Sequence, residues 1–389
     1  MKILFLIYHG FSEVSGISKK IRYQVKGLQQ NGHEVHLCYY DRGSNGHWQR
    51  LIETPTSSIK SIEDFGTGKL AGLRQRFSYG AIYRYCVAEK IEMVYARCFM
   101  NANPCLNHFF RKLKKAGIKA VMEIPTYPYD QEFEGFSYIE RLQLRLDQMF
   151  RKGLAKQLDA IVTFTNESQI FGQRTIRISN GVDLDSIPLY QQVDAAQELH
   201  LIGVAEVHYW HGYDRLIAGL GEYYLHSSHK KDVYFHIVGG VWKSEMYNDE
   251  HAPGFHELIE KYGLQDKVIF HDQLFGDALN QVFAQSSFAV GSLARHRTGI
   301  SDIKTLKNRE YASRGLPFIY SENDSDFDHQ SYVLKVPADE SPIDIARIIE
   351  FEEQLTITPQ QIRQTVEYLS WKVQMQEVVE AAINGKDNM

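Results

Sequence analysis

Short continuous runs of apolar residues alternate along the chain with stretches of helical periodicity. The run at residues 2–8 is followed by a stretch over roughly 17–30 with one apolar helix face, and then by a second run at 34–40. A run that is apolar throughout is typical of a strand buried on both faces of a parallel sheet. The pattern therefore predicts a strand–helix–strand unit and an α/β fold.

The same unit recurs in two successive arrays. The first array ends before residues 184–198, which are polar and weakly patterned, and a new strand at 199–205 begins the second. A chain of 389 residues is also long for a single hydrophobic core. We therefore expect two doubly wound Rossmann-like domains that face each other across a cleft, with the boundary near residue 190.

Several polar residues of the first array come where a predicted strand ends. Arg97 ends one strand, Glu123 lies near the end of the next, and Tyr127 and Asp130 follow in a proline-rich turn. In parallel sheets the residues just past the carboxyl ends of the strands line the ligand crevice. These residues are candidates for contact with an acceptor substrate, and structural hydrogen bonding in the turn is an equal alternative.

The loop after the first strand, residues 9–16, lacks the G-x-G-x-x-G turn of dinucleotide-binding proteins, which argues against an NAD-dependent enzyme. Gly16 stands at the predicted start of a helix, where the backbone can approach a ligand closely. A purely conformational role for this glycine is an equal alternative.

Two carboxylates stand eight residues apart in a predicted helix that begins at Asp302 and ends at Gly315. One face of such a helix can present both Asp302 and Glu310, with Lys304 and Lys307 between them. Carboxylates and lysines suit a polyhydroxylated, negatively charged ligand. The alternative is a solvated charged helix.

Composition and charge narrow the possible functions. The net charge of −5 gives no indication of a nucleic-acid partner, and no apolar run approaches the ~18 residues of a membrane span. No C-x-x-C pair and no secretory signal is visible, so we expect reduced thiols and a cytoplasmic protein. The basic patch at 111–115 is interpreted as a solvated face, with peripheral contact to anionic lipid as the alternative.

Metal-binding patterns are weak. The 16 histidines show no ligand spacing, and the single D-x-D, within residues 323–328, follows a strand late in the second array. We interpret that segment as a polar loop near the ligand rather than a metal site, and we expect no metal and no cofactor.

Motifs along almost the whole chain resemble those of one enzyme family. They are "ISNGVD" at 178–183, "WHGYDRLI" at 210–217, "FHIVGG" at 235–240 and "DIKTLKNREYASRGLPFI" at 302–319. In this order and spacing the chain resembles the retaining nucleotide-sugar glycosyltransferases of family 4 (group 1), which have the GT-B fold. The last motif stands in the place of the family's E-x7-E helix.

The resemblance implies a transferase that moves a sugar from a nucleoside-diphosphate sugar to a glycan or lipid-linked hydroxyl with retention, in surface polysaccharide or glycoconjugate synthesis. It implies that Glu310 contacts the ribose, Asp302 the transferred sugar, and Gly239 and Gly240 lie beneath the donor nucleotide. Residues 1–190 would form the acceptor-side domain and residues 191–365 the donor domain. The last helix, within 366–389, is expected to pack back on the first domain.

The chain departs from the family at the donor diphosphate. The family places an Arg and a Lys after the first strand of the second domain, where this chain has Glu206 and His211. Removing two cations weakens the stabilisation of a leaving diphosphate. We therefore hypothesise that other cations replace them, with His211 as a hydrogen-bond donor. These cations are Lys304, Lys307, Arg295 and Arg297.

Two other functions remain open from the sequence. One is a GT-B enzyme of another class, such as a nucleotide-sugar epimerase or a glycan phosphorylase. The other is a catalytically weak or inactive relative that binds sugar nucleotide, which the departures at Glu206 and His211 keep in consideration.

Overall fold

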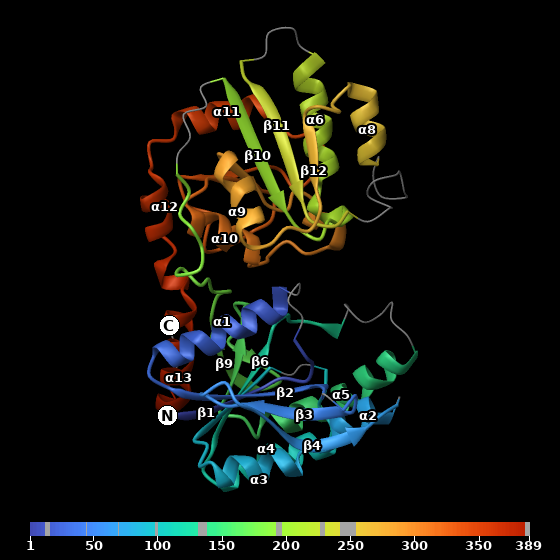
Figure 1. Cartoon of the computed structure of the whole chain (residues 1–389), viewed down its shortest axis with the longest axis vertical. Coiled ribbons are helices and arrows are strands. Elements are labelled where there is room, and N and C mark those ends of the chain that lie inside the picture. Colours follow the sequence, from blue (N-terminus) through green and yellow to red (C-terminus); the bar gives the residue numbers. More distant parts are fainter. Residues whose placement is uncertain are drawn as a thin grey trace. The chain divides into compact units, whose positions relative to one another are not determined.

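The computed structural model describes residues 1–11, 16–43, 45–68, 70–97, 100–130, 138–191, 197–225, 230–241 and 254–385, with the side chain of residue 139 left out. The chain divides into two units (Figure 1). Unit 1 comprises Met1–Gly181 and Ser370–Met389, and unit 2 comprises Val182–Leu369. Unit 1 is therefore built from both ends of the chain, whereas unit 2 is one continuous segment.

The sheet of unit 1 has the strand order β4-β3-β2-β1-β5-β6-β7-β9-β8. Its central strands are parallel, and β3, β4 and β8 pair antiparallel to their neighbours. The strands are β1 (Lys2–Leu6), β2 (Glu34–Arg42), β3 (Trp48–Glu53), β4 (Ile59–Gly66), β5 (Met93–Arg97), β6 (Lys119–Ile124), β7 (Ala160–Thr163), β8 (Gln169–Ile170) and β9 (Gln173–Arg177).

Helices cover both faces of this sheet, because each central strand is apolar on both sides. The helices are α1 (Gly16–Gln30), α2 (Leu70–Phe77), α3 (Gly80–Ala88), α4 (Pro104–Lys115), α5 (Tyr138–Ala155) and α13 (Trp371–Asn384). Ile3 and Phe5 of β1 pack with α1 and α13, whereas Leu4 and Leu6 pack with α3, α4 and α5. Figure 1 shows α1 above the sheet and α3 and α4 below it.

The C-terminal helix α13 is part of the core of unit 1. Trp371, Met375 and Val378 are buried with residues of β1 and α1. A Cβ atom on Gly27 would lie 2.5 Å from the Trp371 carbonyl oxygen, so glycine is what lets α1 and α13 approach so closely. Asn31 donates a hydrogen bond to the Lys372 carbonyl at 2.7 Å. Of the segment expected to pack here, residues 386–389 lie outside the described part of the chain.

Unit 2 holds a parallel sheet with the order β12-β11-β10-β13-β14-β15. Its strands are β10 (Glu198–Val204), β11 (Asp232–Val238), β12 (Val268–His271), β13 (Phe288–Val290), β14 (Phe318–Tyr320) and β15 (Val333–Lys335). Its helices are η2 (Tyr209–His211), α6 (Tyr213–Leu225), α8 (Phe255–Tyr262), α9 (Gly276–Gln285), η3 (Arg295–Thr298), α10 (Leu306–Arg314), α11 (Ile345–Gln354), α12 (Pro359–Gln364) and η4 (Glu367–Leu369).

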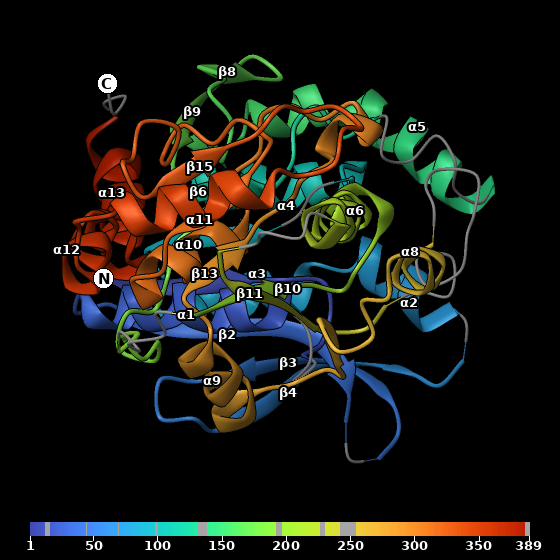
Figure 2. The same ribbon diagram turned by 90° about the horizontal axis from the view of Figure 1, so that it is seen from above.

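Helices also cover both faces of the second sheet. Leu201 and Phe235 pack with α6, α8 and α11, and Ile202 and Val238 pack with α9 and α10. Figure 2 shows α6 and α9 on opposite sides of β10 and β11. The prediction of an α/β fold with two Rossmann-like domains is therefore confirmed.

Two further expectations from the sequence concern the cysteine thiols and membrane-spanning segments. Cys38, Cys86 and Cys105 are free thiols, and Cys98 lies outside the described residues. In the described part of the chain, no helix is both long enough and apolar enough to span a bilayer.

Glu123 lies at the centre of a buried polar cluster in unit 1. Its carboxylate accepts hydrogen bonds from Gln24 at 2.7 Å and Tyr95 at 2.5 Å, and pairs with Lys20 at 3.2 Å and Arg97 at 3.1 Å. Burial acts to raise the pKa of Glu123, but the charges of Lys20 and Arg97 and the hydrogen bonds from Tyr95 and Gln24 together outweigh it and lower the pKa to about 2. The cluster joins α1 to β5 and β6 without leaving this carboxylate unpaired.

Replacing Glu123 by Gln should destabilise unit 1 by about 3–5 kcal/mol at neutral pH, because two buried cations lose their counter-ion. We would measure the free energy of unfolding in urea, with hydrogen exchange in β1 and β6 as the probe. The matched control is Glu53→Gln, which removes a more exposed ion pair with Arg22 and should cost less than about 1 kcal/mol. Equal effects of the two substitutions would contradict the assignment.

Three histidines form a hydrogen-bonded row across β10, β11 and β12. His200 Nδ1 lies 2.9 Å from His236 Nε2, and His236 Nδ1 lies 3.0 Å from His271 Nε2. His200 Nε2 lies 3.2 Å from a Glu198 carboxylate oxygen. Neutral imidazoles satisfy this row head to tail, since each ring donates from one nitrogen and accepts at the other. Burial, followed by the two neighbouring rings, lowers the pKa of His236 to about 4.

The His236 pKa gives unit 2 a pH dependence with a definite sign. Unfolded histidine titrates near ~6.5, so the unfolded chain binds more protons than the folded one between about pH 6.5 and 4. Stability should therefore fall as the pH is lowered through this window, by up to ~1.4 kcal/mol per pH unit from this group.

The test is the difference in that pH slope between wild type and His236→Gln, read by urea unfolding with hydrogen exchange in β10 and β11. The variant should lose the part of the slope that belongs to His236. The exposed His256, which pairs with Glu260 on α8, provides the control substitution His256→Gln, and its slope should match the wild type. A wild-type slope in His236→Gln would refute the assignment.

Candidate functional site

A group of buried polar atoms lies in unit 2, among residues that follow β13 and β14. Arg295 begins η3, Lys307 is the second residue of α10, and Glu322 follows β14 by two residues. Within the described residues, Arg295 Nε, Lys307 Nζ and both carboxylate oxygens of Glu322 are buried and have no hydrogen-bond partner. Buried polar atoms in proteins nearly always have partners, so this concentration marks a site for a polar ligand.

The electrostatics of these groups are linked. Burial lowers the pKa of Lys307, Glu322 opposes that shift, and Arg295 adds to it. Burial raises the pKa of Glu322, and Lys307 is the strongest opposing influence. Burial also lowers the pKa of Arg295. Two cations and one carboxylate therefore share a poorly solvated space, which suits an anionic ligand.

His211 borders the same cluster as an uncharged ring. Burial, followed by Lys307 and Arg295, lowers its pKa well below the usual value. The His208 backbone N–H lies 2.9 Å from His211 Nδ1, and the His208 carbonyl oxygen lies 3.2 Å from the same nitrogen. The shorter contact favours the neutral ring with its proton on Nε2. The Leu293 N–H donates to the His211 carbonyl at 2.8 Å and so fixes η2 beside the loop that leads to η3. His211 can thus donate a hydrogen bond without carrying charge.

Gly239 and Gly240 end β11 beside the loop that follows β10. Gly239 has φ of 123°, and a Cβ atom there would overlap the Ala205 carbonyl oxygen. The Val207 N–H donates to the Gly240 carbonyl at 2.8 Å. The glycines therefore allow the backbones after β10 and β11 to lie in contact at the carboxyl edge of the sheet.

Asp302 is not on the helix that carries Glu310, so the prediction that one helix presents both carboxylates is wrong. Helix α10 begins at Leu306, and Asp302 forms an isolated parallel bridge with Asn323. The Asn323 N–H donates to Ser301 O at 2.7 Å, and the Ile303 N–H donates to Asn323 O at 3.0 Å. This pairing holds the segment extended, which excludes helical backbone before Thr305.

Glu310 does lie on α10, half-buried, where it pairs with Arg314 at 2.8 Å. The exposed Asp302 side chain accepts a hydrogen bond from Ser301 Oγ at 2.7 Å. Both carboxylates keep acceptor capacity for other donors, since each has two oxygens with two lone pairs.

Of the four cations proposed from the sequence to bind the diphosphate, two are held in ion pairs. Arg297 pairs with Asp214 at 2.7 Å and with Glu340 at 2.5 Å, and Lys304 pairs with Asp326 at 3.5 Å. Arg295 Nε and Lys307 Nζ lack such partners in the described residues. The structure therefore brings Arg295, Lys307 and His211 together, and places Lys304 and Arg297 in ion pairs.

The D-x-D carboxylates are held by a buried guanidinium. Arg309 pairs with Asp324 through both terminal nitrogens, at 2.5 and 2.9 Å, and also with Asp326. Arg309 and Asp324 are fully buried. No group of three or more His, Cys, Asp or Glu side chains in the described ranges is arranged to hold a metal ion. These aspartates fix α10 against the loop that follows β14.

The acceptor candidates of unit 1 lie in formed contacts. Glu123 and Arg97 belong to the buried cluster described above. Asp130 accepts two hydrogen bonds from Arg151, at 2.6 and 3.0 Å, and the Tyr127 ring packs on Phe171. Gly16 begins α1 with open space around its Cα, and the preceding residues 12–15 lie outside the described part of the chain.

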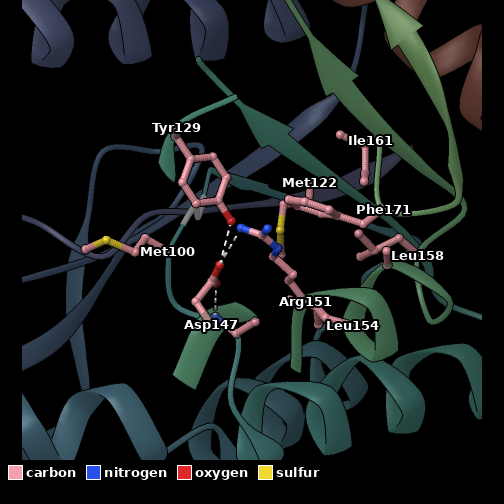
Figure 3. A pocket seen from close by; sticks show the side chains of 11 residues that line it. Met100, Met122, Tyr129, Asp147, Arg151, Leu154, Leu158, Ile161 and Phe171 are labelled. Carbon is pink, nitrogen blue, oxygen red and sulfur yellow. Dashed lines mark hydrogen bonds and ion pairs between the residues drawn. The ribbon is translucent and has the colours of Figure 1, made fainter. Parts of the chain in front are cut away.

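A small cavity lies close to these residues, with a mostly apolar lining (Figure 3). Its polar members are already engaged: Asp147 accepts hydrogen bonds from Tyr129 at 2.6 Å and from the Ala102 N–H at 2.8 Å. Arg151 projects into the same space and binds Asp130. This network ties the turn after β6 to α5, which is a structural task.

Glu322 is the member of the site that the sequence motifs did not indicate. It stands two residues after a short apolar strand, and the general rule for carboxyl ends of parallel strands was the one signal that pointed to it.

No protein-family model and no curated protein sequence matches the chain. Solved structures do match over nearly its whole length. The HepE protein of Anabaena, in complex with UDP-glucose, is 16% identical, with a TM-score of 0.57 over 98% of this chain and 100% of that one. The catalytic domain of starch synthase IV from Arabidopsis thaliana, bound to ADP and acarbose, is 12% identical, with a TM-score of 0.59 over 98% of each chain.

The trehalose-6-phosphate synthase OtsA is 9% identical, with a TM-score of 0.60 over 98% of each chain. These proteins share the arrangement of two Rossmann-like domains that defines the GT-B fold. The chain therefore has the GT-B fold.

Proposed function

We propose that the chain is a retaining glycosyltransferase of the family 4 type. It would move a sugar from a nucleoside-diphosphate sugar to a hydroxyl of a glycan or lipid-linked acceptor, in cytoplasmic steps of surface polysaccharide or glycoconjugate synthesis. The observation that supports this most strongly is that Lys307 Nζ and Arg295 Nε are buried and have no hydrogen-bond partner among the described residues. Buried charge without a partner is costly, and a diphosphate would offset that cost.

The fold comparisons support the same ligand class. HepE was solved with UDP-glucose and starch synthase IV with ADP, and both ligands contain a nucleoside diphosphate. In open α/β sheets ligands bind outside the carboxyl ends of the strands, which is where Lys307, Arg295 and Glu322 lie in unit 2.

The proposed chemistry breaks the bond between the anomeric carbon and the diphosphate. Negative charge grows on the departing phosphate, and the ammonium of Lys307 and the guanidinium of Arg295 would stabilise it. The Nε2–H of His211 would add a hydrogen bond without adding charge. Thr305 makes no side-chain cap at the start of α10, so its hydroxyl does not compete with a phosphate for the first N–H groups of this helix.

The remaining roles follow the family resemblance. Glu310 would bind ribose hydroxyls and Asp302 hydroxyls of the transferred sugar. The acceptor hydroxyl would attack from the side of the leaving group, which retains the anomeric configuration, and the departing phosphate would take its proton. This scheme requires no protein nucleophile, metal or cofactor.

The first test is a panel of UDP-, ADP-, GDP- and dTDP-sugars, with release of nucleoside diphosphate as the measurement. One donor should be slowly hydrolysed, because water can replace the acceptor. For the matching nucleoside diphosphate, Lys307→Ala and Arg295→Ala should each raise the Kd roughly 10- to 100-fold, since hydrogen bonds to charged groups contribute ~1.5–3 kcal/mol. Isothermal titration calorimetry measures this change.

Lys304→Ala is the matched control, because Lys304 lies on the same segment and already pairs with Asp326. Its Kd should stay within about threefold of the wild type, as expected for a partly exposed ion pair. Wild-type affinity in Lys307→Ala would refute the site. Binding without release from any donor would instead favour a non-catalytic relative, which the exposed Glu206 at the family's arginine position makes a specific alternative.

A further inference from the structure

Glu322 is a nearly fully buried carboxylate with no hydrogen bond, and none of the roles above uses it. Its exposed fraction is 2%, and both of its oxygens lack partners among the described residues. Its backbone carbonyl, in contrast, accepts a hydrogen bond from Lys335. The main chain at Glu322 is thus held in place, and its side chain lies close enough to Lys307 and Arg295 to act electrostatically on both.

Two other carboxylates of unit 2 have a purely structural role and provide a comparison for Glu322. Asp324 and Asp214 bind Arg309 and Arg297 directly, and these contacts occupy the terminal nitrogens of both guanidinium groups. Glu322 makes no such contact with Lys307 or Arg295, although it acts electrostatically on both. It therefore favours the charged form of the two cations and leaves their N–H groups available to a ligand.

The groups around this pair have fixed charges near neutral pH. Asp324 is neutralised by Arg309, and His211 is uncharged because its pKa is lowered well below the usual value. The pKa values of the neighbouring tyrosines are raised, so they are uncharged as well; these are Tyr213, Tyr311 and Tyr320. Burial also lowers the pKa of His208, which lies near Arg295. Among the described residues, the ionisable members of the cluster that remain are Lys307 and Glu322, beside the permanent cation Arg295.

We propose that Glu322 is a positioning residue for the proposed transferase: it is a resident counter-ion that keeps Lys307 protonated in the empty site without occupying the lysine N–H groups. The nucleoside diphosphate then meets an ammonium rather than a neutral amine. This inference rests on the proposed function, because it concerns how the same site receives its donor.

The role has a definite pH signature. Burial and Arg295 lower the pKa of Lys307, and Glu322 raises it. Without the carboxylate, Lys307 loses its proton at a lower pH, so affinity for a diphosphate should begin to fall at a lower pH. Burial raises the pKa of Glu322 to about 7. Glu322 therefore loses its charge as the pH falls, so the profiles of the wild type and of Glu322→Gln should converge at the acidic end.

The experiment measures the Kd of UDP, ADP and GDP by calorimetry between pH 6 and 9, and follows the tightest binder. In Glu322→Gln the alkaline fall in affinity should move down by about one pH unit or more, the usual effect of a neighbouring opposite charge. Binding at pH 6 should remain within about threefold of the wild type, and binding at pH 8 should be roughly tenfold weaker. Glu322→Asp keeps the charge and should restore most of the wild-type profile.

Lys307→Arg supplies the matched background. Arginine stays protonated throughout this pH range, so adding Glu322→Gln to Lys307→Arg should not move the alkaline limb. A carboxylate that only supports the fold would weaken binding equally at every pH and in both backgrounds, and that result would overturn the inference. An unshifted profile in Glu322→Gln would do the same.

The experiments distinguish a wrong role for Glu322 from a wrong proposed function. If the wild type binds none of the three nucleotides, or if Lys307→Ala binds as the wild type does, the donor site itself is refuted and this role falls with it. If Lys307→Ala weakens binding while Glu322→Gln keeps the wild-type pH profile, the donor site stands and only the role of Glu322 is wrong.

Discussion

The buried ion pair of Arg309 with Asp324 and Asp326 is the interaction on which the candidate site depends. Arg309 belongs to α10, and the two aspartates belong to the loop after β14. Lys307 precedes Arg309 by two residues, and Glu322 precedes Asp324 by two residues. The pairing therefore sets the positions of the lysine and the glutamate relative to each other. Breaking such a pair typically costs ~3–5 kcal/mol, so these positions are firmly held.

Unit 2 uses chemically similar cations for opposite purposes. Arg309 and Arg297 are surrounded by carboxylates, and the terminal nitrogens of both guanidinium groups are bound within the fold. Lys307 and Arg295 are half-buried as whole residues, but Lys307 Nζ and Arg295 Nε are themselves buried and have no hydrogen-bond partner among the described residues. A ligand site of this kind is maintained at a cost in stability, which the surrounding structure has to cover. In the proposed transferase, this pair stands in for the cations that Glu206 and His211 replace.

The sequence alone predicted the helices and strands whose hydrophobic pattern is visible within a few residues. The apolar run at 2–8 and the helical face that follows it predicted β1 and α1, because both period and length are visible within a few residues. Residues 41–80 are polar and show no clear pattern in the sequence, although β3 and β4 form an antiparallel hairpin there. The middle of β3 is buried on both faces, β4 is mostly exposed, and the register between them contains irregularities, so the alternation in the sequence is weak.

The errors at the site arose where a distant partner decides the local structure. Helical spacing suggested that Asp302 continued α10, but the backbone of Asn323 pairs with this segment and holds it extended. The same limit applies to Glu322, whose importance comes from Lys307 fifteen residues earlier in the chain and not from a motif around it. Spacing rules can place a residue on an element, whereas burial and the presence of a partner depend on tertiary contacts.

The docking of α13 on α1 also has a consequence for the order in which the chain can fold during synthesis. Every residue of unit 2 leaves the ribosome before Trp371, whereas unit 1 needs α13 to cover the face of its sheet that α1 shares. Unit 2 is therefore able to complete its core first. The N-terminal part of unit 1, although made earlier, has to wait with an apolar face exposed until the C-terminal helix arrives, and in that interval it is a natural client for a chaperone.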